Sequence, residues 1–413
     1  MEEVLIKAKL VKSAEKALRM ATTAEKNRAI LEIGKQIKKE QPMILKANHE
    51  DVDKASQNGI SEAMIDRLRL SEARIDDMIK ACSKVAALAD PVGSVIRSWV
   101  KGSLNITQTR VPIGAIGMIY ESRPNVTLDA TILALKSGNP VLLRGGSDAS
   151  ASNMAIARAI KNGLSKTAIP AFAVEIIEDT HRENVSQLLK MNAYLSLIIP
   201  RGGAGLIRYV IENSSIPVLE TGVGNCHIFV DYNADRDKSI EIIDNAKTQR
   251  PGTCNSVETV LIHEEIASQV LPPLYERLCA KGVEIRGCLN TSKIINCKVA
   301  QESDWETEYL DFILAIKVVK NVQEAIEHIE HYSTRHSEAI LTNDLTNARL
   351  FQATVDSAAV YVNASTRFTD GDQFGFGGEI GISTQKLHAR GPVGLEELTT
   401  YKYILIGDYS IRG

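Results

Sequence analysis

The sequence has no marked excess of charge, no long hydrophobic run and no closely spaced pair of cysteines. Its 48 Lys and Arg residues nearly cancel its 51 Asp and Glu residues, which leaves a formal net charge of −3. That balance argues against a nucleic acid partner, because such a partner is held mainly by excess positive charge. No stretch approaches the roughly 18 consecutive apolar residues of a membrane helix, so we expect no membrane span.

The N-terminal segment and the cysteines indicate the compartment. Residues 1–18 mix charged and apolar side chains throughout, unlike a secretory signal with its continuous apolar centre. The six cysteines lack the Cys-x-x-Cys spacing of zinc clusters, and in a chain of this length they are typical of reduced thiols. The sequence therefore predicts a cytoplasmic protein without a bound metal.

Hydrophobic periodicity predicts an α/β fold with more than one domain. A chain of 413 residues is too long for one ordinary core. Residues 1–90 carry apolar positions three and four apart, which predicts consecutive amphipathic helices. Residues 98–114 alternate apolar and polar positions around a Lys-Gly turn, which predicts a β-hairpin suited to be an assembly arm.

Short β-rich runs then alternate with helical patterns. Five such runs are present, at residues 111–120, 140–146, 171–178, 195–200 and 216–222. This alternation indicates a parallel sheet with helices on both faces, and a similar series from Cys226 onward predicts a second α/β domain. After Ala364 the chain is rich in Gly, Thr and Phe, which predicts a loop-rich segment, and a terminal strand is expected near its end.

One cysteine differs from the others in its surroundings. A free cysteine is usually a small buried hydrophobe, and we expect this of Cys82, Cys279, Cys288 and Cys297. Cys254 instead lies in the polar run QRPGTCNSVET, between a predicted helix and a predicted strand. A loop of this kind exposes both the sulfur and its own backbone N–H. The pattern favours a thiolate nucleophile whose oxyanion product is held by a main-chain donor.

Five blocks along the chain extend this interpretation. They are YESRPNVT (120–127), GNPVLLRGG (138–146), ETGVGNCHIFVD (220–231), QRPGTCN (249–255) and the C-terminal run from STRFTDG to LEELTTYK. In this order they resemble the γ-glutamyl phosphate reductase family, aldehyde-dehydrogenase-like enzymes of proline biosynthesis. The resemblance covers most of the chain. It implies an aldehyde-dehydrogenase-like α/β fold, with two Rossmann-like domains and a β-hairpin oligomerisation arm.

The resemblance also implies a reaction, the NADPH-dependent reduction of L-glutamyl 5-phosphate to L-glutamate 5-semialdehyde and phosphate. Cys254 would form the thioester, and the side-chain amide of Asn125 would join the oxyanion hole. On local pattern alone, Asn125 is a turn residue after Pro124. The same loop chemistry also suits an aldehyde dehydrogenase that uses coenzyme A or water, while a non-catalytic nucleotide-binding scaffold is a third hypothesis.

The cofactor residues rest on the resemblance, since no Gly-x-Gly-x-x-Gly fingerprint follows a predicted strand. The block that matches the 2′-phosphate site is also an ordinary strand-to-helix turn, and it contains Arg144, Gly145, Gly146 and Ser147. Gly202 and Gly203 match the site near the pyrophosphate, at the start of a predicted helix. Glu308 matches the glutamate that binds the nicotinamide ribose, although it lies in an exposed acidic run.

Substrate recognition is expected in two loops. Arg123 is either a partner for phosphate or carboxylate or a solvated surface residue. Ser365, Thr366 and Arg367 begin the loop-rich segment, where Arg367 either binds a substrate carboxylate or only pins the loop. Glu220 resembles the general base of hydrolytic relatives by its spacing from Cys254, but a structural or cofactor-side role is more consistent with a phosphate-releasing enzyme. His227 is expected to be a core histidine.

Domain boundaries and partners follow from the same resemblance. It assigns residues 1–97 and 111–221 to cofactor binding, 98–110 and 391–413 to oligomerisation, 222–370 to the catalytic domain and 371–390 to a loop-rich return segment. We expect a homo-oligomer. The glutamate kinase that produces γ-glutamyl phosphate is a candidate partner.

Overall fold

The computed structural model describes residues 2–60 and 62–412, and the chain forms two compact units. The first unit contains the residues up to Thr221, the segment Gly375–Gly381 and the residues from Val393 on. The second unit contains Gly222–Phe374 and Ile382–Pro392. Among the described residues, no helix is both long and apolar enough to cross a membrane.

The first unit opens with the helices that the sequence predicts. They are α1 (Glu2–Met20), α2 (Thr23–Gln57), α3 (Glu62–Leu68) and α4 (Glu72–Ala87). The start of α2 is fixed by a capping box, in which the Thr22 hydroxyl accepts from the Glu25 N–H and the Glu25 carboxylate accepts from the Thr22 N–H. The prediction of consecutive helices is confirmed.

A four-stranded parallel sheet forms the centre of the first unit. Its strands lie in the order β5 (Val174–Ile176), β4 (Val141–Arg144), β3 (Ile116–Tyr120) and β6 (Leu197–Arg201). The connecting helices are α5 (Asn125–Lys136), α6 (Ser150–Leu164) and α7 (Arg182–Leu188), and α8 (Ala204–Asn213) follows β6. Because such crossovers are right-handed, α5 and α6 cover one face of the sheet and α7 covers the other.

The prediction of a fifth strand in this sheet, at residues 216–222, is wrong. This segment makes only an isolated bridge between Ile198 and Val218. Pro217 accepts a hydrogen bond from the Ile198 N–H but has no N–H of its own, so a regular ladder does not form there.

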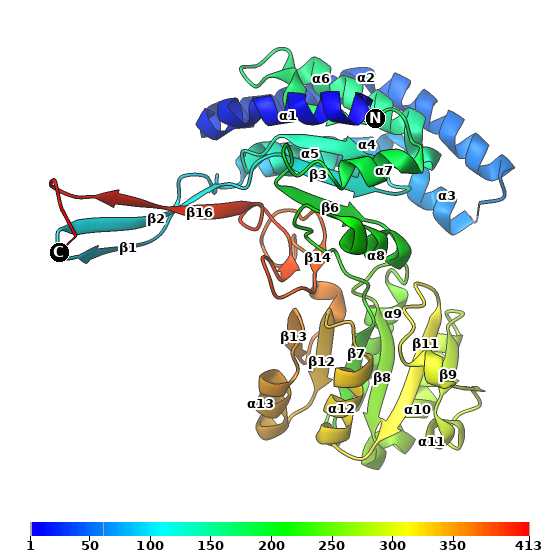
Figure 1. The fold of residues 1–413 in the computed structure, drawn as a ribbon. Coiled ribbons are helices and arrows are strands. Elements are labelled where there is room, and N and C mark those ends of the chain that lie inside the picture. The colour runs from blue at the N-terminus through cyan, green and yellow to red at the C-terminus, as the bar shows by residue number, and fades with distance from the viewer. Residues whose placement is uncertain (1, 61, 413) are drawn as a thin grey trace. The chain divides into compact units, whose positions relative to one another are not determined.

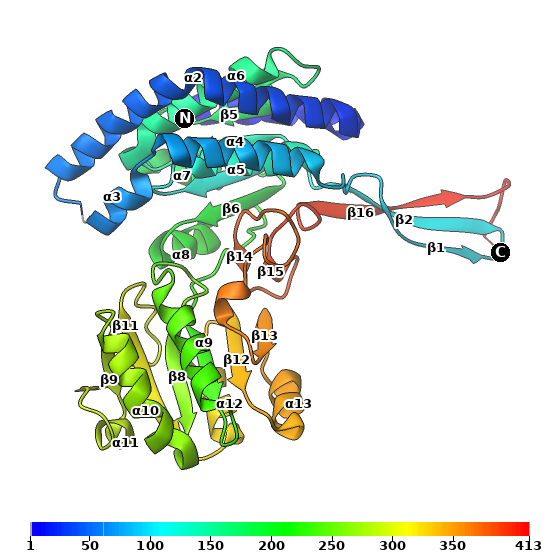
Figure 2. The same ribbon diagram turned by 180° about the vertical axis from the view of Figure 1, so that it is seen from behind.

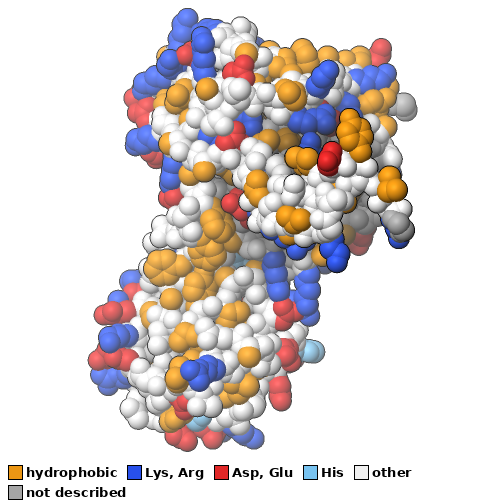
Figure 3. All heavy atoms as spheres, turned by 90° about the vertical axis from the view of Figure 1, so that its left-hand side faces the viewer, with side chains coloured by type: hydrophobic (Ala, Val, Ile, Leu, Met, Phe, Trp, Pro, Cys, Tyr) orange, Lys and Arg blue, Asp and Glu red, His pale blue; other side chains and the backbone are white. Residues whose placement is uncertain are grey.

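Three antiparallel strands form an arm on the first unit. The predicted hairpin is confirmed as β1 (Val95–Lys101) and β2 (Leu104–Pro112), and the predicted terminal strand as β16 (Thr399–Ile406), which pairs with β2. The arm extends away from the helices of this unit (Figure 1; Figure 2). Hydrophobic side chains remain at its surface, with Val100 68%, Leu405 54% and Ile406 65% exposed. Figure 3 looks along the arm from its outer end and shows hydrophobic side chains among the surface atoms.

The second unit is built on a seven-stranded parallel sheet, as the second alternating series predicts. Its order is β10 (Lys298–Val299), β9 (Glu284–Gly287), β11 (Ile313–Val319), β8 (Val257–His263), β7 (Cys226–Val230), β12 (Ser337–Leu341) and β13 (Ala359–Val362). The strands β9 and β10, at one side of the sheet, are too short to give a clear sequence pattern. The helices include α9 (Arg236–Thr248), α10 (Glu264–Cys279), α11 (Leu289–Ser292), α12 (Val322–Tyr332) and α13 (Leu345–Thr354).

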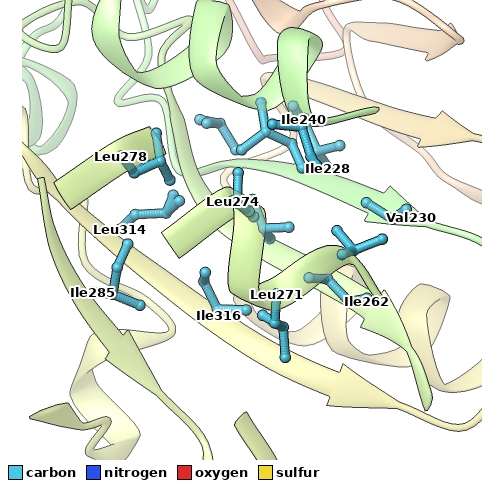
Figure 4. Packing of buried hydrophobic residues seen from close by; sticks show 14 of the residues in the cluster. Ile228, Val230, Ile240, Ile262, Leu271, Leu274, Leu278, Ile285, Leu314 and Ile316 are labelled. Carbon is cyan, nitrogen blue, oxygen red and sulfur yellow. The ribbon is translucent and has the colours of Figure 1, made fainter. Parts of the chain in front are cut away.

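Strand alternation divides the interior of this unit into two cores. Ile228, Val230 and Ile262 point to the core under α9 and α10, which Figure 4 shows, whereas Phe229 and Leu261 point to the core under α12 and α13. Successive side chains of a strand point to opposite faces, so a strand buried on both sides is apolar throughout. Both cores hold the sheet rigid beside the loops at the amino ends of β7, β8 and β11.

The segment after Ala364 contains little regular structure, as the sequence predicts. It has one short 3-10 turn, Thr366–Phe368, and the two-residue strands β14 (Ile382–Ser383) and β15 (Gly391–Pro392) before the arm strand begins.

Candidate active site

The predicted cofactor residues of the first unit gather at one edge of its sheet. Glu121 follows β3, and its carboxylate accepts a hydrogen bond of 2.9 Å from the backbone N–H of Gly203, which precedes α8. A side chain at Gly202 would place its Cβ 2.4 Å from the same carboxylate, and one at Gly146 would lie 3.5 Å from the Glu121 Cα. The ends of β3, β4 and β6 therefore converge on a glycine-lined edge, as expected for parallel strands.

Arg144 and Ser147 differ in exposure. Arg144 is buried and donates from Nη2 to the Thr180 carbonyl at 2.6 Å. Burial lowers the pKa of its guanidinium. The nearby carboxylates of Glu121, Asp148 and Asp179 oppose that shift. Ser147 is exposed at the start of the turn that leads into α6. Ser147 is thus the solvent-facing polar side chain of this block, with Arg144 tied to the protein interior.

Asn125 and Arg123 line a cavity of about 70 Å³ in the first unit. Asn125 begins α5, and its side-chain Nδ2 donates to the Asp129 carboxylate at 2.8 Å. Arg201, at the end of β6, lines the same cavity. Sequence reasoning missed Asp129, although its spacing of four residues from Asn125 places both side chains on one face of the helix.

The loop that carries Cys254 connects α9 to β8 in the second unit, and both of its ends are fixed. At its base, the Lys247 ammonium contacts the Glu258 carboxylate at 2.6 Å, and both side chains are fully buried. The Ser256 hydroxyl donates to the carbonyl of Ala246 at 3.0 Å. The Cys254 side chain itself is half-buried. A polar loop with clamped ends holds this thiol at the surface of a rigid sheet.

A second cysteine supports the Cys254 loop from below. The buried Cys226 thiol donates to the carbonyl oxygen of Cys254 at 3.1 Å, and burial raises the pKa of Cys226 well above its ordinary value. Gly224 packs so closely that an added Cβ would lie 1.6 Å from that same carbonyl oxygen. Sequence reasoning missed both roles. The available signal was the glycine and cysteine of the ETGVGNCH block, which contact the Cys254 loop.

Glu308 and the 365–367 loop also reach this region. The Glu308 carboxylate accepts from the Gly224 N–H at 2.7 Å, which places Glu308 beside the Cys254 loop. The Thr366 hydroxyl donates to the Asn255 carbonyl at 2.8 Å, and the Ser365 hydroxyl accepts from the Arg367 N–H at 3.3 Å. The structure therefore brings Glu308, Ser365 and Thr366 together around Cys254.

Arg367 pins the loop, as one of the two sequence interpretations expects. Its Nη1 donates to the Thr253 hydroxyl at 2.9 Å and its Nε donates to Gln249 at 3.0 Å. Burial lowers the pKa of Arg367, Arg250 acts in the same direction, and Cys254 acts in the opposite one. The guanidinium thus lies within electrostatic range of the Cys254 sulfur.

The remaining sequence expectations have mixed outcomes. His227 is fully buried, and its Nδ1 contacts the Asn225 carbonyl at 3.0 Å, which confirms a core histidine. Glu220 is half-buried in the first unit, whereas Cys254 belongs to the second. The expectation of burial is right for Cys82 but wrong for Cys279, which is exposed because it is the last residue of α10. Cys288 and Cys297 are half-buried.

Comparison with known proteins agrees with this geometry. The model of the aldehyde dehydrogenase family matches residues 5–285. A gamma-glutamyl phosphate reductase from Kosmotoga olearia is 62% identical over 413 residues, covering both chains completely. The crystal structure of the gamma-glutamyl phosphate reductase from Thermotoga maritima covers 100% of both chains at 59% identity, with a TM-score of 0.97. An acetylating aldehyde dehydrogenase from Geobacillus thermoglucosidasius, 16% identical, shares the fold over 100% of this chain and 98% of its own, with a TM-score of 0.72.

The family-model match, together with the two parallel sheets, identifies an oxidoreductase of the aldehyde dehydrogenase class. Identity over the full length is more specific than the fold. It shows that the chain belongs to the γ-glutamyl phosphate reductase family.

Proposed function

We propose that this protein reduces L-glutamyl 5-phosphate to L-glutamate 5-semialdehyde and phosphate with NADPH, as a step of proline biosynthesis. The observation that carries the proposal is the Cys254 loop. It presents a half-buried thiol between two fixed ends, with a neutral thiol and a glycine backbone supporting its carbonyl. A thiolate at this position attacks the acyl carbon, the acyl–oxygen bond to phosphate breaks, and inorganic phosphate leaves with the bonding electron pair.

Stabilisation of the oxyanion is assigned to two donors. The backbone N–H of Cys254 is one, and the side-chain amide of Asn125 is the other. An amide nitrogen has two hydrogens, and Asp129 accepts only one of them from Asn125. The second hydrogen is the one that this mechanism requires at the carbonyl oxygen of the substrate. Donors fixed before the reaction stabilise the developing charge most effectively.

The residues of the first unit fit a dinucleotide. The N–H of Gly203 opens α8, and that N–H already holds one anionic group, the Glu121 carboxylate. Gly202 and Gly203 would hold the pyrophosphate, Gly145, Gly146, Ser147 and Arg144 the 2′-phosphate side, and Glu308 the nicotinamide ribose. When bound, NADPH supplies the hydride that reduces the thioester.

We assign Arg367 to the phosphoryl group of the substrate. Its guanidinium donates to the hydroxyl of Thr253, the residue directly before Cys254. In this mechanism a guanidinium at that position faces the reacting end of the substrate, which carries the phosphoryl group. The α-carboxylate lies several bonds away from that end. Ser365 and Thr366 fix the same loop. Arg123, a residue of the first unit, is assigned to an anionic group of the substrate.

The assay that tests this function runs the reaction backwards. Glutamate 5-semialdehyde, NADP⁺ and phosphate are combined with the protein, and NADPH formation is followed at 340 nm. We expect formation to require all three reactants. If coenzyme A or water replaces phosphate without loss of rate, the protein is an acylating or hydrolytic aldehyde dehydrogenase instead. If no NADPH forms under any condition, the non-catalytic scaffold hypothesis is favoured.

We also propose that the arm of β1, β2 and β16 joins two copies of the chain. Trp99, Tyr401, Tyr403 and Leu405 lie on one face of this sheet, where the rings of Trp99 and Tyr403 are 6.2 Å apart. Exposed apolar faces of this kind mark contact surfaces.

A further inference from the structure

The cavity beside Asn125 has a charge pattern that the proposed chemistry of Cys254 does not require. Four charged side chains line it, two basic and two acidic, and these are Arg123, Arg201, Asp129 and Glu379. Asn125 and apolar residues line the remainder. A thioester mechanism needs only the Asn125 amide at this place. The charges therefore favour a ligand that carries both a positive and a negative group.

Asp129 and Arg201 are the two groups whose partners are incomplete. Among the residues that the structure describes, the Asp129 carboxylate accepts one hydrogen bond, from Asn125, and has no cationic partner. The guanidinium of Arg201 has neither a side-chain hydrogen bond nor an ion pair with a described residue. Charged groups in a cleft are costly without a partner of opposite sign.

The size of the cavity limits what binds there. A cavity of about 150 Å³ accommodates benzene, whereas this one measures about 70 Å³. It has room for the charged end of a small molecule and excludes a nucleotide base. An ammonium and a carboxylate on one carbon atom match both the volume and the two signs of charge.

We propose that this cavity recognises the α-amino acid end of the substrate, with Asp129 binding the ammonium and Arg201 the carboxylate. The inference rests on the proposed function, because it uses Asn125 as the donor at the carbonyl oxygen. Asp129 is hydrogen-bonded to Asn125 at 2.8 Å, so an ammonium bound to Asp129 lies close enough for the carbonyl group of the same substrate, a few bonds away, to reach the Asn125 amide. Burial raises the pKa of Asp129 to about 6, as expected of a carboxylate that lacks its cation.

Substrate analogues without the ammonium test this assignment. 5-Oxopentanoate is glutamate 5-semialdehyde without its α-amino group. We expect the unaltered protein to prefer the amino compound in the reverse assay. Asp129→Asn should lower kcat/KM for the amino compound by about tenfold to a hundredfold, the loss expected for one hydrogen bond to a charged group. The same variant should change kcat/KM for 5-oxopentanoate by less than about threefold.

Two further variants complete the design. Arg201→Met should lower kcat/KM for both aldehydes, because both carry the carboxylate. Asp76→Asn is the matched control, since Asp76 is an exposed residue of α4 that pairs with Lys38, and it should change neither. If Asp129→Asn lowers kcat/KM equally for both aldehydes, Asp129 only positions Asn125 and the proposal is overturned. An unaltered protein that shows no preference for the amino compound overturns it as well.

Failure of the proposed function is recognised separately, as absence of NADPH formation with either aldehyde. A binding measurement then decides the inference. L-glutamate should raise the melting temperature of the unaltered protein more than glutarate does, and this difference should disappear in Asp129→Asn. Equal stabilisation by the two ligands would overturn the assignment of Asp129.

Discussion

At the scale of single residues, the site contains a half-buried thiol and a fully buried one. Cys254 is half-buried in a polar loop, whereas Cys226 beneath it is buried and has a strongly raised pKa. Ionisation is therefore disfavoured at Cys226, and a neutral thiol is what its hydrogen bond to the Cys254 carbonyl requires. Two cysteines in contact thus have different roles because their solvation differs.

Cys254→Ala should abolish turnover, because no other described side chain on this loop offers a comparable nucleophile. Folding and NADPH binding should stay near normal, and both are measured by thermal unfolding and by fluorescence titration. Cys279→Ala, at an exposed thiol outside the site, is the control and should retain full activity. A Cys254→Ala protein that keeps even about a tenth of the activity would remove the assignment of the nucleophile.

Asp129 should make stability depend on pH. Its folded-state pKa of about 6 lies above the unfolded value near 3.8, so the folded protein binds the proton more tightly. Stability is then lost as pH rises from about 4 to about 6, and the loss persists above that range. Arg123, Arg201 and Glu379 are the other charged residues that line the cavity.

Melting temperatures of Asp129→Asn and of the unaltered protein, measured from about pH 4 to about pH 8, check this prediction. The variant should be the more stable protein at the upper end of the range, and the difference should shrink towards the lower end. Asp76→Asn should show no such trend. A difference that grows as pH falls would contradict the raised pKa.

At the scale of elements, the Cys254 loop depends on the junction of α9 and β8. The ion pair between Lys247 and Glu258 joins these elements directly beneath the loop, and both side chains are shielded from water. A buried pair of this kind adds little stability compared with apolar residues, but removal of one partner leaves an uncompensated charge.

Lys247→Met should therefore lower the free energy of unfolding by about 3–5 kcal/mol. Replacing both partners, as Lys247→Met with Glu258→Met, should recover most of that loss. Urea denaturation of the two variants measures the difference. If the double variant is as unstable as the single one, the cost arises from lost packing and not from the buried charge.

The first turn of α8 carries a second prediction. The Glu121 carboxylate accepts the hydrogen bond from the Gly203 N–H, so a pyrophosphate bound at that position is repelled by its negative charge. Glu121→Gln should tighten NADPH binding by about threefold to tenfold. Glu212→Gln, at the opposite end of α8, is the control. Fluorescence titration gives both dissociation constants, and unchanged or weaker binding in Glu121→Gln would place the pyrophosphate elsewhere.

At the scale of the whole molecule, the arm has no core of its own. Three strands with exposed apolar side chains gain stability when another surface covers them. The proposal of a homo-oligomer therefore rests on the same residues that leave the arm incomplete.

Leu405→Glu places a charge on the aromatic face of the arm and should shift the protein from the oligomer to the monomer. Sedimentation or light scattering measures this shift. Asn105→Glu places the same charge on the opposite face, beside Val100 and Ile406, and a smaller shift there assigns the contact to the aromatic face. A monomeric unaltered protein, or an oligomer that persists in Leu405→Glu, would refute the role of this face.

The sequence by itself determined the elements with strong periodicity and singled out Cys254 as the candidate nucleophile. The helices of residues 1–90, the hairpin and most strands follow from patterns of apolar residues, and Cys254 differs from the other cysteines by its polar neighbours. The short strands β9 and β10 could not be predicted, because two to four residues hold too little pattern. The predicted strand at residues 216–222 does not form, because Pro217 has no N–H to donate.

Only the tertiary structure decided which distant residues meet. Gly224, Cys226 and Glu308 come to the Cys254 loop from other parts of the chain, since they lie at or before the amino ends of β7 and β11, and parallel strands bring these ends to the same edge as the start of β8. Asp129 and Arg201 lie far apart in the sequence but line one cavity, and their incomplete partners are visible only when their neighbours are known. Local patterns specify elements, whereas contacts between elements depend on the packing of the entire sheet.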